Sequence, residues 1–530
     1  MEFVTPMAKA VREAYARGED DEQMEPLVLT DSEGKPIGKI KDGDTVIFYD
    51  IRGEREVEIT KALACKDFSY FNREPEAVTK FVTMIEYHPD LPVEVAFPPM
   101  GEIKDTLGEV LANNKITTTK ITETEKEVHL KYFFSGKRLD PFPGEDGSFV
   151  TSIKTNNYED YPEMKTDEVV EKVIKALEDT ERQVVIVNIP NVDVIGHIEK
   201  KESILKAVNK VDSATGIILE KAAEMGVTSI ITADHGTVES WIYDDGTIDT
   251  GHTNSPVDFF IVEPDQDLQK KIELREGGQL IDVAPTLCDI IGIDAPEIWE
   301  GQSLLKENVY ADSSSERVLL LIRDGWGSLP EGEGNLIKQS DTPVNNKILA
   351  DNPKAHTNIE ASGVYVGMPE GKVGNSEVGH IHLGSGRVIK SDRMRIEAAV
   401  ESGEFLKNEV FVKAIKDSKE DGTSLHLMGI VSFYSSHGSI EHMKALLGMA
   451  KELGHSEVYI HGMLGRRGEK PFSGAIYTAD IENECKKLGL GKLTTLMGRH
   501  WSLDREENWD RIEKTYNSMV AGIGDGIVDN

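Results

Sequence analysis

The sequence predicts an α/β protein of at least two domains, on three observations. First, 530 residues are more than a single hydrophobic core usually holds. Second, 39% of the residues are hydrophobic and 7% are aromatic, which suits packed cores and argues against disorder. Third, buried-strand patterns alternate with helix patterns, and three of the strands end beside an acidic or imidazole side chain. This recurring order predicts a mainly parallel sheet with candidate ligands along one edge.

Charge and cysteine content exclude several classes of protein. The formal net charge of −35 leaves no basic surplus to neutralise phosphates, which argues against general nucleic-acid binding. The three cysteines are widely separated and form no CxxC pair, so neither a disulfide framework nor a thiolate metal site is expected. No stretch approaches the ~20 apolar residues of a membrane span, and the first residues lack a signal-peptide core. We therefore expect a cytoplasmic protein.

The first hundred residues predict one helix and two strands. Residues 8–17 have a helix pattern, and 44–51 and 81–87 have buried-strand patterns. Arg52 and Arg55 follow the first strand, at the end where open α/β sheets bind ligands; a solvated loop is the alternative. The proline-rich stretch that ends near Pro99 is a candidate linker.

Helices and strands alternate through the next two hundred residues. Helix patterns cover 105–114, 164–179 and 202–225. Thr166 is expected to cap the second of these helices. The stretch 121–134, which carries Lys126, is interpreted as a passage from helix to strand. Residues 305–317 have no apolar periodicity and predict a surface linker.

Potential metal ligands follow three buried strands. Strand 183–188 is followed by Asp193 and His197, and strand 228–232 by Asp234 and His235, with His252 in a loop farther on. A third strand, from residue 316, ends at Asp324. Carboxylates mixed with imidazoles suit manganese or zinc. Any one of these residues could have an ordinary structural role, in a turn, at a helix cap or as a hydrogen-bonded histidine. Their occurrence at three strand ends together indicates a metal site.

The stretch Gly-Asn-Ser-Glu-Val-Gly-His at 374–380 contains a candidate nucleophile. Gly374 and Gly379 remove side-chain bulk on either side of Ser376, so its hydroxyl could be approached closely. No His-Asp pair stands at a familiar spacing to activate the serine, which leaves a metal as the candidate activator. With the six ligands above, Ser376 makes seven groups, which are too many for one tetrahedral ion and suit a pair of ions for phosphoryl transfer. Taken alone, the motif fits a glycine-rich turn that tolerates a serine better.

Cationic residues recur after strand patterns, mainly in the first hundred and last hundred residues. Strands are expected at 425–431 and 458–463, and a helix is expected around Trp509. Arginine binds carboxylate and phosphate through two parallel hydrogen bonds, so such residues predict a pocket for a small multi-anion. Unrelated solvated cations are the alternative for any one of them. The group is Arg52, Arg55, Lys126, His437, Arg467, Arg499 and Arg505.

These motifs resemble one known family over nearly the whole chain. The family is the cofactor-independent (2,3-bisphosphoglycerate-independent) phosphoglycerate mutases of the alkaline phosphatase superfamily. The motifs that carry the resemblance include LLIRDGWG, GNSEVGH followed by GSGR, GRHWSLDR, VIFYDIRGER, TETEKEVH, NVDVIGH, ITADHG and GHTNSPV. The resemblance implies an alkaline-phosphatase-like α/β/α sandwich with a mainly parallel sheet and a second, transferase-like α/β domain.

The order of the motifs differs from that of the family. The stretch that usually starts the family, at 318–324, lies here after the stretch that usually ends it, which is similar to a circular permutation. The resemblance then implies a phosphatase-like domain at 101–390 as one continuous segment. The transferase-like, substrate-binding domain would be assembled from 391–530 together with 1–100.

The resemblance also implies a role for each residue. One divalent metal, for which the family suggests manganese with zinc or cobalt as alternatives, would be held by Asp193, His197 and His252. The other would be held by Asp324, Asp234, His235 and Ser376. Ser376 would take a phosphoryl group from 3-phosphoglycerate, and glycerate would accept it on its other hydroxyl. His437, Lys126 and the arginines would hold carboxylate and phosphate. Family members are commonly monomers, and a small phosphorylated hydroxy acid would be the partner.

The departures from the family lie in the substrate half. The family has an aspartate directly after the arginine that matches Arg467, where this chain has Gly468. That aspartate is thought to handle the glycerate hydroxyl. Two alternatives to a phosphoglycerate mutase therefore stay open. One is a phosphomutase or phosphohydrolase for a related phosphorylated or phosphonate hydroxy acid, and the other is a non-catalytic binding protein that keeps the fold.

Overall fold

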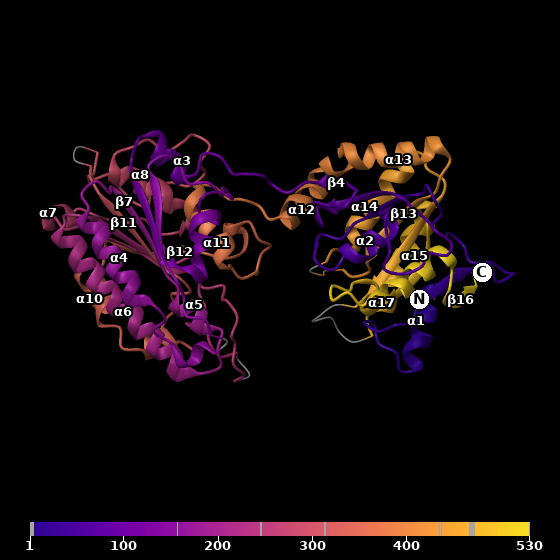
Figure 1. Ribbon diagram of the computed structural model, residues 1–530, viewed down its shortest axis with the longest axis horizontal. Coiled ribbons are helices and arrows are strands. Elements are labelled where there is room, and N and C mark those ends of the chain that lie inside the picture. Colours follow the sequence, from indigo (N-terminus) through magenta and orange to yellow (C-terminus); the bar gives the residue numbers. More distant parts are fainter. Residues whose placement is uncertain are drawn as a thin grey trace. The chain divides into compact units, whose positions relative to one another are not determined.

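The computed structural model describes residues 5–155, 157–243, 246–311, 314–433, 435, 437–465 and 472–528. The chain divides into two compact units (Figure 1). Unit 1 consists of residues 1–99 and 395–530, and unit 2 consists of residues 100–394. Each unit is built around an eight-stranded, mostly parallel sheet, so the prediction of an α/β protein with two domains is confirmed.

The sheet of unit 2 carries the predicted ligand strands at its centre. Its order is β10-β12-β9-β8-β11-β7-β5-β6, in which β9 is antiparallel to both β8 and β12 and the other neighbours are parallel. The strands are β5 (Thr118–Glu123), β6 (Glu145–Val150), β7 (Val184–Ile189), β8 (Thr228–Thr232), β9 (Val257–Val262), β10 (Gly278–Gln279), β11 (Val318–Arg323) and β12 (His356–Glu360).

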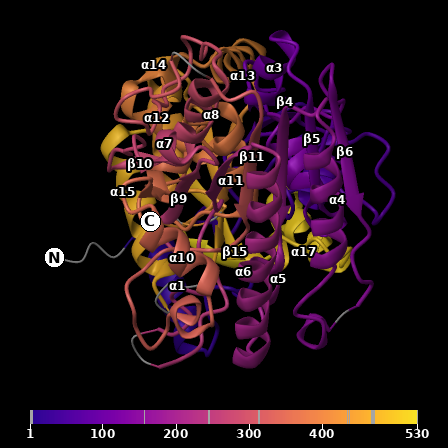
Figure 2. The same ribbon diagram turned by 90° about the vertical axis from the view of Figure 1, so that its left-hand side faces the viewer.

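The three central strands are mainly apolar and lie wholly inside unit 2. All residues of β7, β8 and β11 are buried, as expected for parallel strands covered on both faces. Helices α4 (Thr166–Glu178) and α6 (Lys201–Glu224) lie side by side on one face, and α8 (Val283–Ile291) and α11 (Ser376–Ser385) lie on the other (Figures 1 and 2). The remaining helices of unit 2 are α3 (Leu107–Asn113), α5 (Asn191–Gly196), α7 (Gln266–Gln269), α9 (Leu336–Gln339) and α10 (Pro343–Asp351).

The register of the central strands brings their carboxyl ends to one level. Arg323 at the end of β11 pairs with Ile189 at the end of β7, and Ile322 pairs with Thr232 at the end of β8. The residues that come next along each strand therefore meet at one edge of the sheet. Arg323 itself is buried, with its guanidinium 4.3 Å from the centre of the Trp326 ring and a 2.7 Å hydrogen bond to Asn345.

The sheet of unit 1 combines strands from both ends of the chain. Its order is β16-β1-β15-β14-β13-β2-β3-β4. The neighbours β1 and β15 are antiparallel to each other, and the other neighbouring strands are parallel. The strands are β1 (Leu27–Thr30), β2 (Thr45–Phe48), β3 (Lys80–Ile85), β4 (Glu94–Phe97), β13 (Leu425–Ile430), β14 (Val458–Leu464), β15 (Lys492–Gly498) and β16 (Asp525–Val528).

Helices with one buried face cover this sheet. They are α1 (Pro6–Ala16), α2 (Val57–Ala64), α13 (Glu409–Asp421), α14 (Ile440–Glu452), α15 (Gly474–Leu488), α16 (Arg499–Ser502) and α17 (Trp509–Tyr516). Helix α12 (Asp392–Ser402) begins at the end of unit 2 and continues into unit 1. Among the described residues, no helix is both long and apolar enough to cross a membrane.

Two local predictions are wrong. Thr166 does not cap α4: the cap position is Lys165, and the Thr166 hydroxyl instead bonds Glu163 O and Asn191. The stretch 121–134 runs from strand to helical turns rather than from helix to strand. It contains the end of β5, then a short 3₁₀ turn at Thr124–Lys126 and a π-helical turn at His129–Phe133. The β-branched residues of TTKIT pair with β6 and β7, and this pairing determines the order.

Candidate active site

Ser376 lies at the first residue of helix α11, where the chain is held by a side-chain cap. The Asn375 side chain accepts a hydrogen bond from Val378 N at 3.0 Å, which satisfies one of the free amides at the helix start. The Ser376 hydroxyl is 2.9 Å from His235 Nε2 and 3.3 Å from Asp324 Oδ1. It is also 2.5 Å from Lys126 Nζ. A serine, an imidazole, a carboxylate and an ammonium group therefore meet at one buried point.

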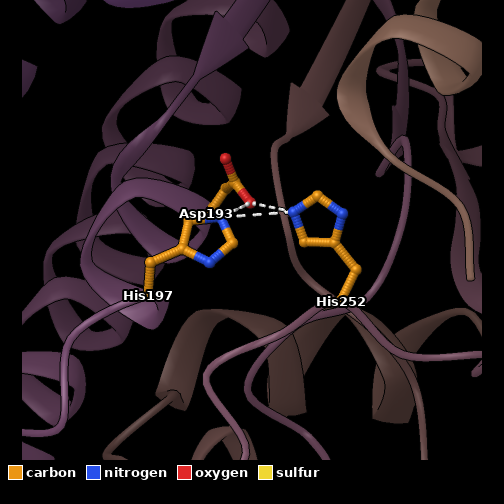
Figure 3. Close-up of side chains that lie close together, drawn as sticks. All are labelled: Asp193, His197 and His252. Atoms are coloured by element: carbon orange, nitrogen blue, oxygen red, sulfur yellow. Dashed lines mark hydrogen bonds and ion pairs between the residues drawn. The ribbon is translucent and has the colours of Figure 1, made fainter. Parts of the chain in front are cut away.

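Asp193, His197 and His252 form the first of two ligand groups. Figure 3 shows both imidazoles turned towards the Asp193 carboxylate. Asp193 Oδ1 is 3.1 Å from His252 Nε2 and 3.3 Å from His197 Nε2, and the two Nε2 atoms are 3.2 Å apart. The opposite ring nitrogens donate to backbone carbonyls, His197 Nδ1 to Thr250 O and His252 Nδ1 to Gly374 O. Because each Nδ1 carries the proton, each Nε2 is available as a metal ligand.

Asp324, Asp234 and His235 form the second group around Ser376. Asp234 Oδ1 accepts hydrogen bonds from Gly325 N and His235 N. Its other oxygen, Oδ2, is buried and accepts no well-formed hydrogen bond among the residues described, although His380 Nδ1 lies 3.2 Å away. A buried carboxylate oxygen that lacks a full hydrogen bond is costly unless a cation binds there. This observation fits a metal ligand.

Lys126 lies among the carboxylates of both groups. Its ammonium donates to Asp193 Oδ2 at 2.7 Å and to Asp324 Oδ1 at 2.9 Å. Burial alone would lower the pKa of Lys126, but the charges of Asp324 and Asp193 outweigh it and raise that pKa. Lys126 thus lies beside Ser376 within unit 2.

The carboxylates outnumber the cation that faces them. Burial would raise the pKa of Asp193 and of Asp234, yet neighbouring cationic and imidazole groups hold both pKa values low, so both side chains stay charged. Burial raises the pKa of Asp324, and the negative charge of Asp234 adds to the rise. One ammonium among three buried carboxylates leaves excess negative charge. The donor set therefore suits divalent cations.

Two supporting residues were not predicted from the sequence. Asn188 donates to Asp324 Oδ2 at 2.7 Å and contacts His380 Nε2 at 3.0 Å. His380 Nδ1 donates to Ser376 O at 2.9 Å and lies 3.2 Å from Asp234 Oδ2. The sequence feature that could have identified His380 is its position four residues after Ser376, because residues four apart lie on the same side of a helix. Asn188 carried no signal beyond its place at the end of a buried strand.

The cations of unit 1 form a separate group. The pKa of Arg55 is lowered, chiefly by burial and then by the positive charges of Arg505, Arg499 and Arg52, which lie nearby. His437 lies near the same arginines, and its Nδ1 is 2.6 Å from Glu56 Oε1, a contact that the sequence did not predict. Arg467, Gly468 and the rest of 466–471 lie outside the described residues. The four described arginines and His437 thus surround one part of unit 1.

The fold and this donor set define a metal-dependent α/β enzyme. Residues 14–295, just over half of the chain, match the model described as the metalloenzyme superfamily, and the chain belongs to that superfamily. Residues 396–529 match the model described as the BPG-independent PGAM N-terminus. A segment described as N-terminal thus follows the metalloenzyme segment, which is the order of a circular permutation. Asp324 and Ser376 lie between the two matched segments.

Curated relatives carry the name 2,3-bisphosphoglycerate-independent phosphoglycerate mutase. The protein from Listeria welshimeri is 36% identical over 300 residues, which is 56% of this chain and 57% of the relative. The protein named mutase 1 from Methanosarcina acetivorans is 38% identical over 57% of this chain and 58% of the relative. The chain thus spans little more than half the length of these relatives in one alignment. A solved Leishmania mexicana phosphoglycerate mutase at low cobalt concentration is 28% identical over 52% of this chain and 53% of that one, with a TM-score of 0.38, too low to support an inference.

Proposed function

We propose that this protein is a phosphomutase that interconverts 3-phosphoglycerate and 2-phosphoglycerate through a phosphoserine at Ser376. The observation that carries the proposal is the meeting of the Ser376 hydroxyl with His235, Asp324 and Lys126 at the edge of the unit 2 sheet. The names of the curated relatives support the choice of substrate. The formal charge of −35 supports a small anionic substrate bound by local cations rather than a nucleic acid.

Two divalent cations, with manganese as our choice and zinc or cobalt as alternatives, complete the proposal. Asp193, His197 and His252 would hold one, and Asp324, Asp234, His235 and Ser376 the other. When bound, such ions lower the pKa of a coordinated hydroxyl and neutralise charge on the attacking and leaving oxygens.

The residues of the chain perform the remaining tasks. Ser376 Oγ gives up its proton and attacks the phosphorus, the bond from phosphorus to the substrate oxygen breaks, and the departing oxygen takes up a proton, so that the step balances. The Lys126 ammonium, 2.5 Å from Ser376 Oγ, balances the negative charge of the transferred group. Helix α11 presents its first amides beside Ser376, which also favours an anion there. The arginines of unit 1 hold the carboxylate and phosphate of the hydroxy acid.

A phosphorus NMR time course tests the proposal. Purified protein with manganese and 3-phosphoglycerate, and without bisphosphoglycerate, is expected to produce 2-phosphoglycerate. Ser376→Ala should abolish the conversion because it removes the nucleophile, whereas the control Ser402→Ala, at the exposed end of α12, should not. A wild-type protein that leaves 3-phosphoglycerate unchanged would contradict the proposal.

The glycine at position 468 supports a second candidate function. In this alternative the protein is a phosphomutase or phosphohydrolase for a related phosphorylated or phosphonate hydroxy acid. The family aspartate that handles the substrate hydroxyl is missing there, so the substrate pocket differs from that of the family. Release of free phosphate in the same time course would favour a hydrolase, and turnover of a phosphonate analogue in place of phosphoglycerate would favour the altered substrate.

A further inference from the structure

Three titratable side chains, of Asp50, Glu56 and His437, meet inside unit 1. Only His437 has been given a role above, as a residue that would hold the substrate. Asp50 and Glu56 are fully buried, and His437 is 1% exposed. One ligand-type atom of each lies within 4.8 Å of the others. Asp50 follows β2, Glu56 precedes α2, and His437 follows β13, so three segments converge at the carboxyl edge of two neighbouring parallel strands. This is the edge at which an α/β sheet binds its ligand.

The strongest contact in this cluster is between Glu56 and His437. Glu56 Oε1 lies 2.6 Å from His437 Nδ1, and both side chains are almost completely buried. The other carboxylate oxygen of Glu56 accepts from Arg55 N at 3.0 Å, which fixes the orientation of the carboxylate. In the described part of the chain, His437 Nε2 has no hydrogen-bond partner. The imidazole is therefore held at one nitrogen and available at the other.

Asp50 completes the cluster as a second acid. Its Oδ1 accepts from Ile430 N at 2.8 Å, while Oδ2 is buried without a partner among the described residues. Burial raises the pKa of Asp50 well above its usual range, and the charge of Glu56 raises it further. The groups that face His437 are Asp50, Glu56, Arg52, Arg55 and Arg499. Three nearby arginines oppose a metal ion at this position.

The charge state of the pair suits a base. Burial raises the pKa of Glu56 to about 8 and lowers the pKa of His437 to about 4. With Glu56 ionised and the ring neutral, the pair carries one proton, on Nδ1, and a net charge of −1, which the nearby charges of Arg52 and Arg55 favour. In that state, which becomes populated as the pH rises towards 8, the lone pair of Nε2 is free to accept a second proton.

We propose that Glu56 is a positioning residue that holds His437 by Nδ1 and makes Nε2 the acceptor for a proton from the hydroxyl of the bound hydroxy acid. The inference rests on the proposed function, because the neighbouring arginines are what would bind that acid. It assigns to Glu56 and His437 the task of the aspartate that Gly468 replaces.

The proton transfer balances within the cluster. The O–H bond of the substrate breaks, its electron pair stays on oxygen, and the proton forms a new N–H bond at Nε2. The Glu56 carboxylate stabilises the resulting imidazolium, as in other carboxylate–histidine pairs. The oxygen is then a stronger nucleophile for the phosphoryl group that it accepts. In the reverse direction Nε2 returns the proton to the departing oxygen.

Kinetics of Glu56→Gln provide the first test. An amide cannot stabilise an imidazolium, and its N–H group would favour the wrong ring tautomer. We expect kcat for 3-phosphoglycerate to fall by about 100-fold or more, with KM unchanged and with the pH dependence altered. Glu56→Asp should recover part of the loss. The matched control Glu58→Gln, two residues farther on in α2, should behave as wild type.

A substrate whose leaving group needs no proton separates the base from the nucleophile. Phosphoryl transfer from p-nitrophenyl phosphate to the enzyme depends on Ser376 but not on an acid at the leaving oxygen. Glu56→Gln should therefore keep that activity. Equal losses on both substrates would overturn the inference, because they would indicate a structural effect. Unchanged turnover of 3-phosphoglycerate by Glu56→Gln would overturn it too.

Nitrogen NMR of histidine-labelled protein provides a readout that needs no turnover. The wild-type protein should show His437 with Nδ1 protonated and Nε2 bare, and D-glycerate should shift the Nε2 signal. Glu56→Gln should exchange the two ring nitrogens. A His437 signal that does not respond to D-glycerate overturns the inference even if the mutase assay succeeds. A response with no mutase activity refutes the proposed function alone.

Discussion

Gly379 of helix α11 packs directly against the backbone of Asp234. A Cβ atom at position 379 would lie 2.5 Å from Asp234 O and 2.8 Å from Asp234 Cβ. Gly374, before Ser376, is similarly crowded by Ala361 O. Both glycines let the helix that carries the nucleophile approach the strand ends that carry the ligands. The sequence indicated a need for small residues here, and the structure identifies protein backbone as what they approach.

Gly379→Ala should therefore separate Ser376 from its neighbours. The new methyl group would push α11 away from Asp234, and a displacement of about 1 Å in an active site can cost about 100-fold in rate. We expect a loss of that size in phosphoglycerate turnover, with a loss of about 1–3 kcal/mol in the free energy of unfolding. The control is Gly448→Ala, because a Cβ at position 448 meets nothing within 4 Å. Wild-type turnover by Gly379→Ala would refute the role of this close packing.

Lys126→Met should damage the site by removing a charge while keeping the length of the side chain. Asp193 and Asp324 would lose the ammonium at 2.7 and 2.9 Å, and buried carboxylates without a partner are destabilising by several kcal/mol. We expect turnover to fall by at least about 100-fold, since a charge that faces the transferred group is lost. Manganese should raise the melting temperature of the variant more than that of wild type. Lys131→Met, on an exposed side chain of the neighbouring turn, is the control, and an equal loss there would refute the prediction.

Chelation of divalent metal should destabilise unit 2. Asp193, Asp234 and Asp324 carry more negative charge than Lys126 balances, so a ligand that binds only the folded state stabilises it by mass action. At a free metal concentration of about 100 times Kd, the gain is about 2.7 kcal/mol. Differential scanning calorimetry with manganese and with EDTA measures the difference. Asp234→Asn, which changes the buried Oδ2, should reduce the gain, whereas an equal response in this variant would contradict the assignment.

The sequence predicted the part of the site that depends on the order of elements along the chain. Asp193, Asp234 and Asp324 were recognisable because each follows an apolar strand, and parallel strands end at one edge. Contacts made only through space were not predictable in this way. Asn188 and Glu56 acquire their partners from segments more than a hundred residues away, and nothing in their local sequence names those partners.

Local competition between hydrogen bonds explains the wrong cap at α4. Threonine is a common helix-capping residue, but the Thr166 hydroxyl donates a 2.8 Å hydrogen bond to Asn191 at the start of α5 instead. Tertiary partners thus replaced a local interaction that the sequence favoured. The antiparallel position of β9 between β8 and β12 was also not predicted, because its apolar run has the same composition as that of a parallel strand.

His382 should make unit 2 less stable in acid. Its Nδ1 donates to Val378 O at 2.6 Å, and its Nε2 accepts from Ile389 N at 3.0 Å, so only the neutral ring fits. Burial lowers the pKa of His382 from 6.5 to about 4, although the bond to Val378 opposes the shift. The unfolded chain therefore binds a proton between these pH values that the folded chain excludes. Stability is complete above pH 6.5 and falls as the pH drops towards 4, by about 3 kcal/mol for this group.

Urea unfolding followed between pH 7.5 and pH 4.5 would measure this dependence for His382→Gln, whose amide can make both hydrogen bonds but cannot titrate. The slope of the unfolding free energy against pH reports how many more protons the unfolded chain binds. We expect this number to be smaller than in wild type by up to one proton. His88→Gln is the control, because His88 is exposed in unit 1. Other buried histidines, such as His426 and His461, also have lowered pKa values and contribute to the wild-type slope. The comparison of slopes isolates His382, and an unchanged slope in His382→Gln would mean that the ring is protonated in the folded protein.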